Sequence, residues 1–299
     1  MRSKAFSPGH ITGLFSICME NEILKTGSIG AGVNISEGVF SNVCIKSNNK
    51  SDIQIKINNI ERTDAYTSKY VIEKALRNSS KTYSIKVNHH TDLPIGSGFG
   101  TSGAGALSLS LALNEILELG MTRIEAAQLA HEAEVSVRTG LGTVSAELEG
   151  GIDLRTVAGA PGIGETNKIP LTTDLTCIAL VYGPMPTSEM LNNEVLRERI
   201  NVIGQPLLDR LIENPNVETF LKCSSEFTKN IGLMTPRVNR ALNKLEELGY
   251  NSGMIMFGEG IFTLTEKKEV SKIIKHLEPI QNEVKIIVSK VDNNGAHSN

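Results

Sequence analysis

The sequence has no tryptophan and only four cysteines in 299 residues. The cysteines stand far apart, at Cys18, Cys44, Cys177 and Cys223, with no C-x-x-C pair and no histidine at zinc-finger spacing. This spacing argues against a disulfide-stapled domain and against a zinc finger, and it predicts free thiols in a reducing compartment. The chain is long enough to fold around a hydrophobic core without such staples.

Neither sign of charge is in large excess, because 30 Lys and Arg face 33 Asp and Glu, for a formal net charge of −3. Non-specific nucleic-acid binding depends on clustered basic residues, and single-stranded RNA is usually held by stacking aromatics as well. Aromatic residues make up only 4% of this chain. We therefore expect no nucleic-acid partner.

Long apolar runs are also missing. The most apolar stretch, residues 104–119, is shorter than the ~20 residues that a membrane span needs, and it contains Asn114, Glu115 and Glu118. Residues 1–6 are basic but lack the apolar segment of a secretory signal. We therefore expect a cytoplasmic protein with no membrane partner, in which 104–119 forms a core helix.

Periodicity and capping signals predict a mixed α and β chain. Thr122 and Glu125 form a capping box, which predicts a helix over 122–137. Thr235 followed by Pro236 predicts the start of a later helix. Further expected elements are strands at 53–57, 82–87, 177–181 and 254–257, a helix capped by Asp64 and ending at Arg77, and a frayed polar tail from Asp292 to Asn299.

The strongest chemical signal is a glycine-rich loop at residues 93–105, which leads directly into the apolar helix. Glycine at every second position lets backbone N–H groups turn inward together, and the helix N-terminus adds about half a positive charge. Such a place binds phosphate. No Gly-Lys-Ser or Gly-Lys-Thr follows, so the loop is not a Walker A motif. A flexible loop with an ordinary helix cap is the weaker interpretation.

A nucleotide phosphate normally travels with magnesium, so a carboxylate should approach the loop. On the predicted helix 122–137, helical spacing places Glu134 on a face of small residues. Spacing alone slightly favours a different interpretation, an acid at the edge of a solvated face. His131 on the same helix is interpreted as a core residue.

Three stretches, in the same order along the chain, resemble the motifs of the GHMP superfamily of small-molecule kinases, which includes galactokinase, homoserine kinase and mevalonate kinase. Residues 7–13 (SPGHITG) resemble the N-terminal motif, residues 94–104 the phosphate loop, and residues 254–264 the C-terminal glycine motif. Within the superfamily, details of the sequence most resemble the archaeal pantoate kinases, as seen at residues 27–33, 130–134, 138–144 and 160–164.

The resemblance implies a two-lobed α+β fold, with an S5-like N-terminal lobe over 1–170 and a ferredoxin-like C-terminal lobe over 171–299. It implies an ATP-dependent kinase that phosphorylates pantoate to 4-phosphopantoate in coenzyme A biosynthesis, with Mg²⁺ as cofactor and a homodimer as assembly. Ser102 and Glu134 would be the catalytic and magnesium-binding residues. The residues expected to bind the ATP phosphates are Pro94, Gly96, Ser97, Gly98, Gly100, Thr101, Ser102 and Gly103.

One position departs from the family pattern. Mevalonate kinase and galactokinase carry an aspartate a short distance before a Gly-Gly pair, and Thr143 stands at that distance before Gly150 here. Homoserine kinases lack this aspartate too, and phosphoryl transfer depends mainly on positioning and charge neutralisation. No general base is therefore assigned, and the nearby acids Glu147 and Asp153 stay open as bases or as surface residues.

An acid acceptor such as pantoate needs a cation or an N–H cluster to hold its carboxylate. We rank His10 first, because it lies in the motif that the family places beside the acceptor, and Arg155 second. A solvated strand arginine is an equally good interpretation of Arg155. Ser28 is expected to line the same pocket, with a tight turn as the alternative, and Arg62 and Arg138 are further candidates.

Three rival functions stay open. A kinase of the same fold could act on another small hydroxy acid or amino acid, such as homoserine or mevalonate. A non-catalytic relative could bind ATP or a metabolite as a sensor, and the missing aspartate favours this. An RNA-binding protein that shares the S5-like lobe conflicts with the net charge.

Overall fold

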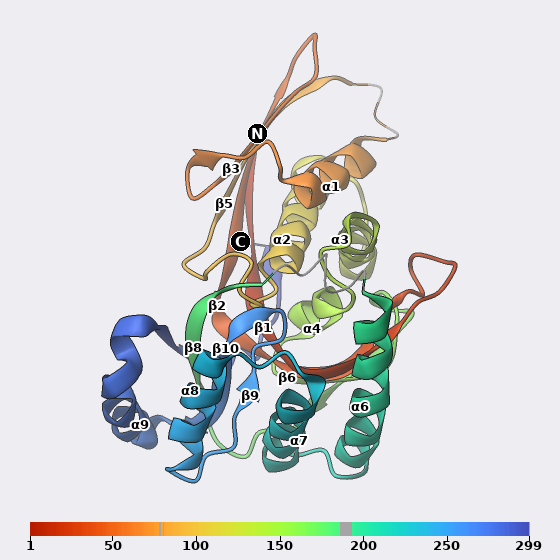
Figure 1. The fold of residues 1–299 in the computed structure, drawn as a ribbon. Helices are drawn as coiled ribbons and strands as arrows, with labels where there is room; N and C mark the ends of the chain where they lie inside the picture. Colours follow the sequence, from red (N-terminus) through yellow and green to blue (C-terminus); the bar gives the residue numbers. More distant parts are fainter. Residues whose placement is uncertain (78, 80, 186–192, 299) are drawn as a thin grey trace.

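The computed structural model describes residues 1–77, 79, 81–185 and 193–298. The described residues form two sheets, of which the first runs from the upper part of Figure 1 into its lower part and the second lies in the lower part alone. The first sheet contains β1 (Arg2–Cys18), β2 (Gly27–Ser47), β3 (Asp52–Ile57), β4 (Ile60–Glu61), β5 (Tyr83–His90), β6 (Ile152–Val157), β7 (Glu165–Ile169) and β12 (His297–Ser298). The second is antiparallel, in the order β11-β8-β10-β9, and contains β8 (Leu175–Pro184), β9 (Gly253–Met254), β10 (Gly258–Glu266) and β11 (Lys285–Lys290).

Helices cover both sheets. The first group consists of α1 (Tyr66–Leu76), α2 (Thr101–Ile116), α3 (Arg123–Val137) and α4 (Thr143–Glu149). In this group α2 and α4 contact strands of the first sheet, and α1 and α3 pack on α2. The second group follows β8 in the chain: α6 (Glu194–Glu213), α7 (Val217–Ile231), α8 (Pro236–Glu246) and α9 (Val270–Leu277), with the 3-10 turns η1 (Lys267–Glu269) and η2 (Glu278–Glu283). Among the described residues, no helix combines the length and the apolar character needed to cross a membrane.

The long strands β1 and β2 connect the two halves of the molecule. They pair antiparallel along their length, with irregularities in register between Pro8 and Gly9 and between Thr12 and Leu14. Beyond this bend β2 changes partner, from β5 to β6. One end of the pair contributes to a hydrophobic core with α1–α3, and the other end contributes to a core with the second sheet and α6–α8. The bend therefore lies where the two cores meet.

Most of the predicted elements are confirmed. The capping box of α3 has both of its reciprocal hydrogen bonds, and Thr235 caps α8 by accepting a hydrogen bond from the Val238 amide. The predicted core helix is α2, which is almost entirely buried. The strands predicted at 53–57, 82–87 and 177–181 correspond to β3, β5 and β8.

Two local predictions, of a helix cap and of a strand, are wrong. Asp64 does not cap α1, because Ala65 holds the cap position and the Asp64 carboxylate instead accepts hydrogen bonds from Arg62 at 2.8 and 2.7 Å. The strand expected over 254–257 ends at Met254. The next residues form a tight turn into β10, closed by a hydrogen bond from the Gly258 amide to the Ile255 carbonyl.

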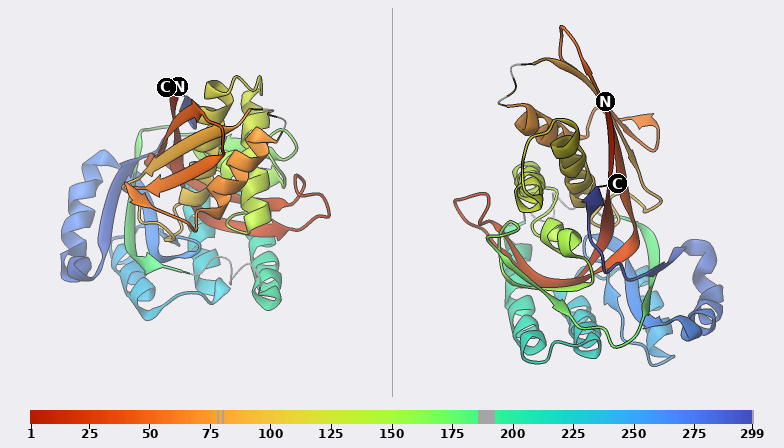
Figure 2. Two further views of the ribbon diagram at one scale, coloured as in Figure 1. Left: turned by 90° about the horizontal axis from the view of Figure 1, so that it is seen from above. Right: turned by 180° about the vertical axis from the view of Figure 1, so that it is seen from behind.

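The polar tail is not frayed, which corrects a further prediction. Asp292 Oδ1 accepts hydrogen bonds from the amides of Asn294 and Gly295 and so closes a turn. The chain then pairs with β1 through His297 and Ser298, so its last described residues lie beside Ala5 and Phe6, near the beginning of the chain (Figure 2). Asn299, the last residue of that predicted tail, lies outside the described residues.

Candidate active site

The three stretches that resemble kinase motifs meet at the bend of β1. The His10 amide donates to the carbonyl of Phe99 in the glycine loop at 3.0 Å, and the Met256 amide donates to the Thr12 carbonyl at 3.3 Å. The loop also packs directly on the C-terminal glycine motif, because Gly258 has no side chain to keep the Ser97 carbonyl away. Segments from the beginning, middle and end of the chain thus build one site.

The glycine loop has the alternating backbone that its sequence predicts. Gly96, Gly98 and Gly100 have φ angles of +75°, +81° and +63°, a region that favours glycine. Gly100 is the N-cap of α2, and no side chain caps this helix end. The first-turn amides of α2 are therefore left for a ligand, as in other anion sites at helix N-termini.

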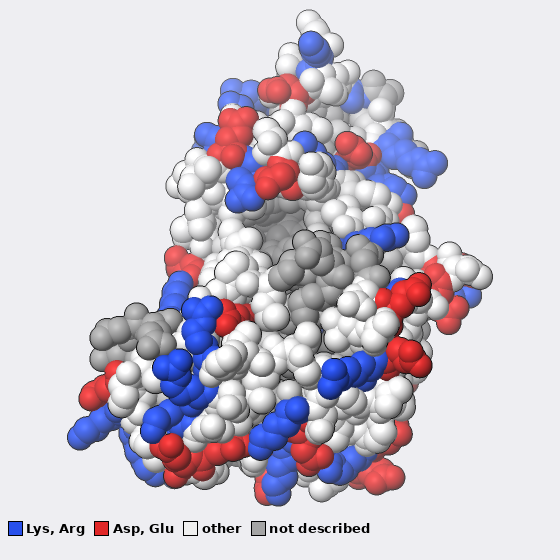
Figure 3. Space-filling model, viewed as in Figure 1, with Lys and Arg blue, Asp and Glu red and all other residues white. Residues whose placement is uncertain are grey.

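A cavity of about 440 Å³ runs along this loop. Basic and acidic side chains are interspersed on the face of the molecule drawn in Figure 3. The cavity volume suits a small-molecule ligand. Of the residues predicted to bind ATP phosphates, those that line the cavity are Gly96, Gly98, Gly100, Thr101 and Ser102. Pro94, Ser97 and Gly103 are not part of its lining.

Glu134 lies beside the loop, in the wall of this cavity, and its side chain is buried. Thr139 donates a hydrogen bond to Oε1 at 3.1 Å, Thr143 donates to Oε2 at 2.9 Å, and the Ser102 hydroxyl also hydrogen-bonds the carboxylate. Burial raises the pKa of Glu134, and the three hydroxyls oppose that shift. The structure therefore brings together Ser102 and Glu134, the two residues predicted to bind magnesium.

The chemistry of these two side chains fits Mg²⁺. Carboxylate and hydroxyl oxygens are hard ligands, and Mg²⁺ beside a nucleotide is usually held by one or two protein groups together with phosphates and water. No group of three His, Cys, Asp or Glu residues that could hold a metal gathers in the part of the chain that the structure describes.

Arg155 on β6 and Ser28 on β2 line the same cavity. Arg155 Nη1 donates to the Gly142 carbonyl at 3.0 Å, and Nε lies 3.3 Å from Asp153 Oδ2. Within the described residues, Nη2 has no hydrogen-bond partner although Arg155 is only 3% exposed. Gly30 makes room for this atom, since a Cβ there would lie 2.8 Å from it. A buried guanidinium with a free N–H at a cavity wall is a site for an anion.

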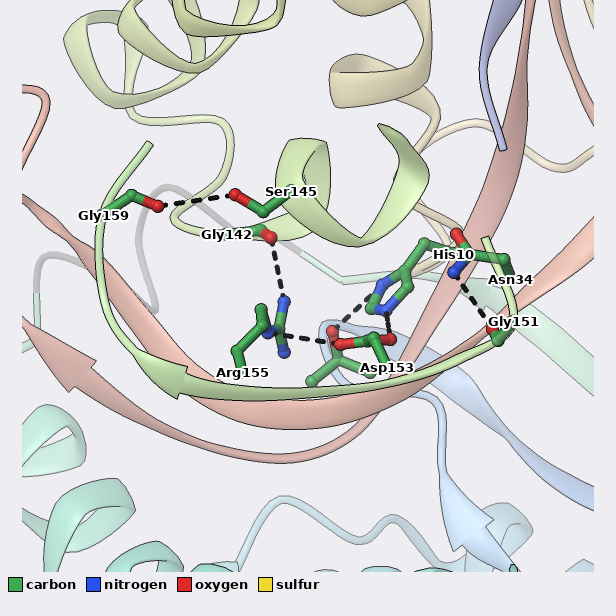
Figure 4. Close-up of polar contacts among 9 residues, drawn as sticks. His10, Asn34, Gly142, Ser145, Gly151, Asp153, Arg155 and Gly159 are labelled. Carbon is green, nitrogen blue, oxygen red and sulfur yellow. Dashed lines mark hydrogen bonds and ion pairs between the residues drawn. The ribbon is translucent and has the colours of Figure 1, made fainter. Parts of the chain in front are cut away.

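His10, ranked first for the acceptor, lies behind the cavity wall rather than in it. Its Nε2 lies 2.7 Å from Asp153 Oδ1, and Figure 4 shows the two side chains pointing toward one another, with Arg155 beside them. His10 is on β1 and Asp153 on β6, and β2 pairs with both strands. Because a carboxylate only accepts, Nε2 carries the proton and Nδ1 is an acceptor, 3.4 Å from the Thr12 hydroxyl. Arg62 and Arg138, the further candidates, do line the cavity.

Known proteins match this chain over almost its whole length. The model of the GHMP kinases N terminal domain matches residues 66–151. A pantoate kinase of Thermococcus kodakarensis is 36% identical over 91% of this chain and 90% of its own length, and one of Methanocaldococcus jannaschii is 35% identical over 91% and 96%. This chain belongs to the pantoate kinase family. A solved structure described as a phosphotransferase related to the CoA biosynthesis pathway agrees, with a TM-score of 0.90 at 30% identity over 100% of this chain and 99% of that one.

Membership in the pantoate kinase family confirms the predicted GHMP resemblance and the two-lobed α+β fold. The chain is therefore an ATP-dependent small-molecule kinase. The division into lobes at residue 170 and the roles of individual residues stay predictions. The residue roles now rest on the geometry of the cavity as well as on the sequence.

Two buried acids near the cavity had no clear role in the sequence. Burial alone would raise the pKa of Asp153, yet its interaction with His10, which donates a hydrogen bond to it, and the charge of Arg155 hold the pKa below its usual value. Burial and the nearby Glu134 charge raise the pKa of Glu147 well above its usual value, and neither of its carboxyl oxygens has a partner among the described residues. The alternation of Asp153 and Arg155 along a strand was the signal that both face one way.

Proposed function

We propose that this member of the pantoate kinase family transfers the γ-phosphate of ATP to the primary hydroxyl of pantoate. The products would be 4-phosphopantoate and ADP, a step of coenzyme A biosynthesis. The substrate named for its relatives of 36% and 35% identity supports this proposal, and so does a cavity that offers a phosphate site and a carboxylate site together.

The observation that carries the proposal is the free Nη2 of Arg155 at the cavity wall. Ser28 Oγ and Arg155 Nη1 both lie within about 3.2 Å of the place where a Cβ on Gly142 would stand, so the hydroxyl and the guanidinium are neighbours. A carboxylate bound there would satisfy the orphaned N–H. The glycine loop and the α2 N-terminus supply the amides for the phosphates.

Ser102 and Glu134 would hold Mg²⁺ at the junction of these two subsites. When bound, Mg²⁺ neutralises charge on the phosphates during transfer. The chain's own contribution is orientation: Thr139 and Thr143 fix the Glu134 carboxylate through their hydroxyls, and the loop fixes the phosphate. Thr143 stands at the position of the missing aspartate. Its hydroxyl donates a hydrogen bond to Glu134 and so orients that carboxylate.

Two further parts of the proposal come from the family resemblance. We expect a homodimer and a cytoplasmic location, where ATP is abundant and the free cysteines stay reduced. Size-exclusion chromatography with light scattering measures the oligomeric state directly.

The test is ADP release with Mg²⁺ and ATP against pantoate, homoserine, mevalonate and no acceptor, followed by mass analysis of the product. We expect turnover on pantoate with one added phosphate. Turnover on another acid would keep the kinase and reject pantoate, and a blank panel with ATP still bound would favour the sensor.

Variants of the magnesium residues test the machinery. Ser102→Ala and Glu134→Gln should each reduce turnover at least tenfold, which corresponds to about 1.4 kcal/mol of transition-state stabilisation. Binding of Mn²⁺ in the presence of a non-hydrolysable ATP analogue should weaken in both variants. Near-native turnover and Mn²⁺ binding in both would remove these residues from the metal site.

A further inference from the structure

A continuous line of polar groups leads from the cavity wall into the sheet. Thr12 lines the cavity and its Oγ1 lies 3.4 Å from His10 Nδ1, while His10 Nε2 lies 2.7 Å from Asp153 Oδ1. His10 and Asp153 are fully buried, and Thr12 is half-buried. Hydroxyl, imidazole and carboxylate thus follow one another, with only the hydroxyl at the cavity.

The backbone holds this line in place. Thr12 lies at an irregularity of β1, and both neighbouring segments are anchored, since the His10 amide bonds the glycine loop and the Thr12 carbonyl bonds the C-terminal motif. Gly32 on β2 is paired with Asp153 and has no side chain, so the imidazole can lie over it and reach the carboxylate. Any larger residue at Gly32 would occupy the position of the ring.

Other candidates for receiving the proton of the acceptor hydroxyl are already engaged. Glu134 accepts hydrogen bonds from Ser102, Thr139 and Thr143, and Thr143 uses its own proton for that bond. Glu147 is fully buried and is not part of the cavity lining. By contrast, the line that begins at Thr12 passes through His10 and ends at the Asp153 carboxylate, which would stabilise a positive charge on the His10 imidazole.

We infer that Thr12, His10 and Asp153 form a relay that accepts the proton of the acceptor hydroxyl during phosphoryl transfer. This rests on the proposed kinase reaction but not on pantoate as the acceptor. The acceptor oxygen forms its bond to the γ-phosphorus while the bond to the β-phosphate oxygen breaks, and that electron pair leaves with ADP. The acceptor O–H proton passes to Thr12 Oγ1 as the Thr12 proton passes to His10 Nδ1, which leaves an imidazolium beside the Asp153 carboxylate.

The charged groups around His10 suit this role. Asp153 faces it from β6, and Arg155 on the same strand faces Asp153 in turn. Glu147 on α4 is a third charged group near His10. A Cβ on Gly100 would lie 2.5 Å from Glu147 Oε1 and 3.3 Å from His10 Cβ. In this arrangement Thr12 would contact the reacting atoms, whereas His10 and Asp153 act through it as positioning and proton-holding residues.

The deciding experiment compares Thr12→Val with Thr12→Ser in the full-length enzyme. Valine keeps the shape of threonine and removes the hydroxyl, while serine keeps the hydroxyl. We expect kcat to fall at least tenfold in Thr12→Val and to stay within about threefold of the native value in Thr12→Ser, with the KM for ATP unchanged in both. Thr156→Val is the matched control, because Thr156 lies outside the cavity and its hydroxyl has no partner among the described residues.

The pH profile distinguishes a relay from a packing effect. In the native enzyme kcat should decline toward acid pH, because an imidazole that already carries two protons cannot accept the proton from Thr12. The acid decline should be absent from Thr12→Val and from His10→Gln. Native kcat in Thr12→Val, or an unchanged acid decline in it, would overturn the relay. Failure of the kinase proposal looks different, since the native enzyme would then release no ADP with any acceptor.

Discussion

Two histidines lie buried in the same sheet with hydrogen bonds at both ring nitrogens, yet their surroundings differ in one respect. His10 on β1 meets the hydroxyl of Thr12 and the carboxylate of Asp153. His89 on β5 meets only hydroxyls, with Ser41 Oγ 2.8 Å from Nδ1 and Ser68 Oγ 3.0 Å from Nε2. The first site has a charged partner and the second has none.

The network around His89 can be followed to its end. Ser108 donates to the Ala104 carbonyl at 2.7 Å, so Ser41 donates to Ser108 and accepts from His89 Nδ1, and Ser68 donates to Nε2. Every member is satisfied while His89 is neutral, and burial lowers its pKa to about 4. Burial and full hydrogen bonding thus leave His89 unable to hold a proton near neutral pH. The surroundings of His10 differ by the neighbouring carboxylate of Asp153.

The largest expected effect comes from removing that carboxylate. Asp153→Asn leaves the Arg155 guanidinium buried without its counter-charge, so we expect the free energy of unfolding to fall by about 3–5 kcal/mol at pH 7. Ser41→Ala removes a neutral partner of the other histidine and should cost only about 1–3 kcal/mol, with kcat unchanged. Urea unfolding and initial rates measure both. Equal losses of stability in Asp153→Asn and Ser41→Ala would contradict the distinction between a charged and a neutral histidine partner.

Acid pH should lower the free energy of unfolding through His89. The pKa of His89 is about 4 in the folded chain against an ordinary value of 6.5, so below pH 6.5 the unfolded chain binds a proton that the folded chain refuses. Stability is therefore fully present above about pH 6.5 and falls as the pH drops toward 4, by about 3 kcal/mol from this group.

Urea unfolding of the native chain and of His89→Gln between pH 7 and pH 4 isolates this contribution, because the other titrating groups are common to both. We expect the native chain to lose more stability than the variant over this range. Parallel curves would show that His89 is protonated without penalty.

The sequence predicted the local parts of this picture and not the long-range ones. The capping box of α3, the cap at Thr235 and the glycine loop depend on residues a few positions apart, so their signals lie in the sequence itself. The proximity of His10 to Asp153 depends on β2 pairing with both β1 and β6, which no local pattern encodes. The prediction of a frayed tail was wrong for the same reason, because the tail pairs with β1 at the other end of the sequence.

Arg155 contacts Asp153, as His10 does, but it also lines the cavity. A substitution of Arg155 therefore tests the cavity side of the buried charged group. Arg155→Lys keeps a positive charge near Asp153 and loses the forked donors. We expect the KM for the acid acceptor to rise about tenfold, or about 1.4 kcal/mol, with the KM for ATP within twofold. Arg62→Lys is the matched control at the same cavity, where the arginine is exposed and paired with Asp64. Equal effects at Arg155 and Arg62 would remove the assigned carboxylate site.

The smallest effect concerns Glu147, a buried acid that has neither a charged partner, as His10 has, nor a hydroxyl partner, as His89 has, among the described residues. Its pKa is raised well above 4.5 by burial and by the Glu134 charge, so between the ordinary and the raised pKa the folded chain binds a proton that the unfolded chain has lost. Stability from this group is therefore present at acid pH and is lost as the pH rises, the reverse of His89. Relative to Glu147→Gln, the native chain should lose about 1 kcal/mol or more between pH 5 and pH 8 in urea unfolding. A gain over that range would mean that Glu147 is ionised in the folded chain and has a partner there.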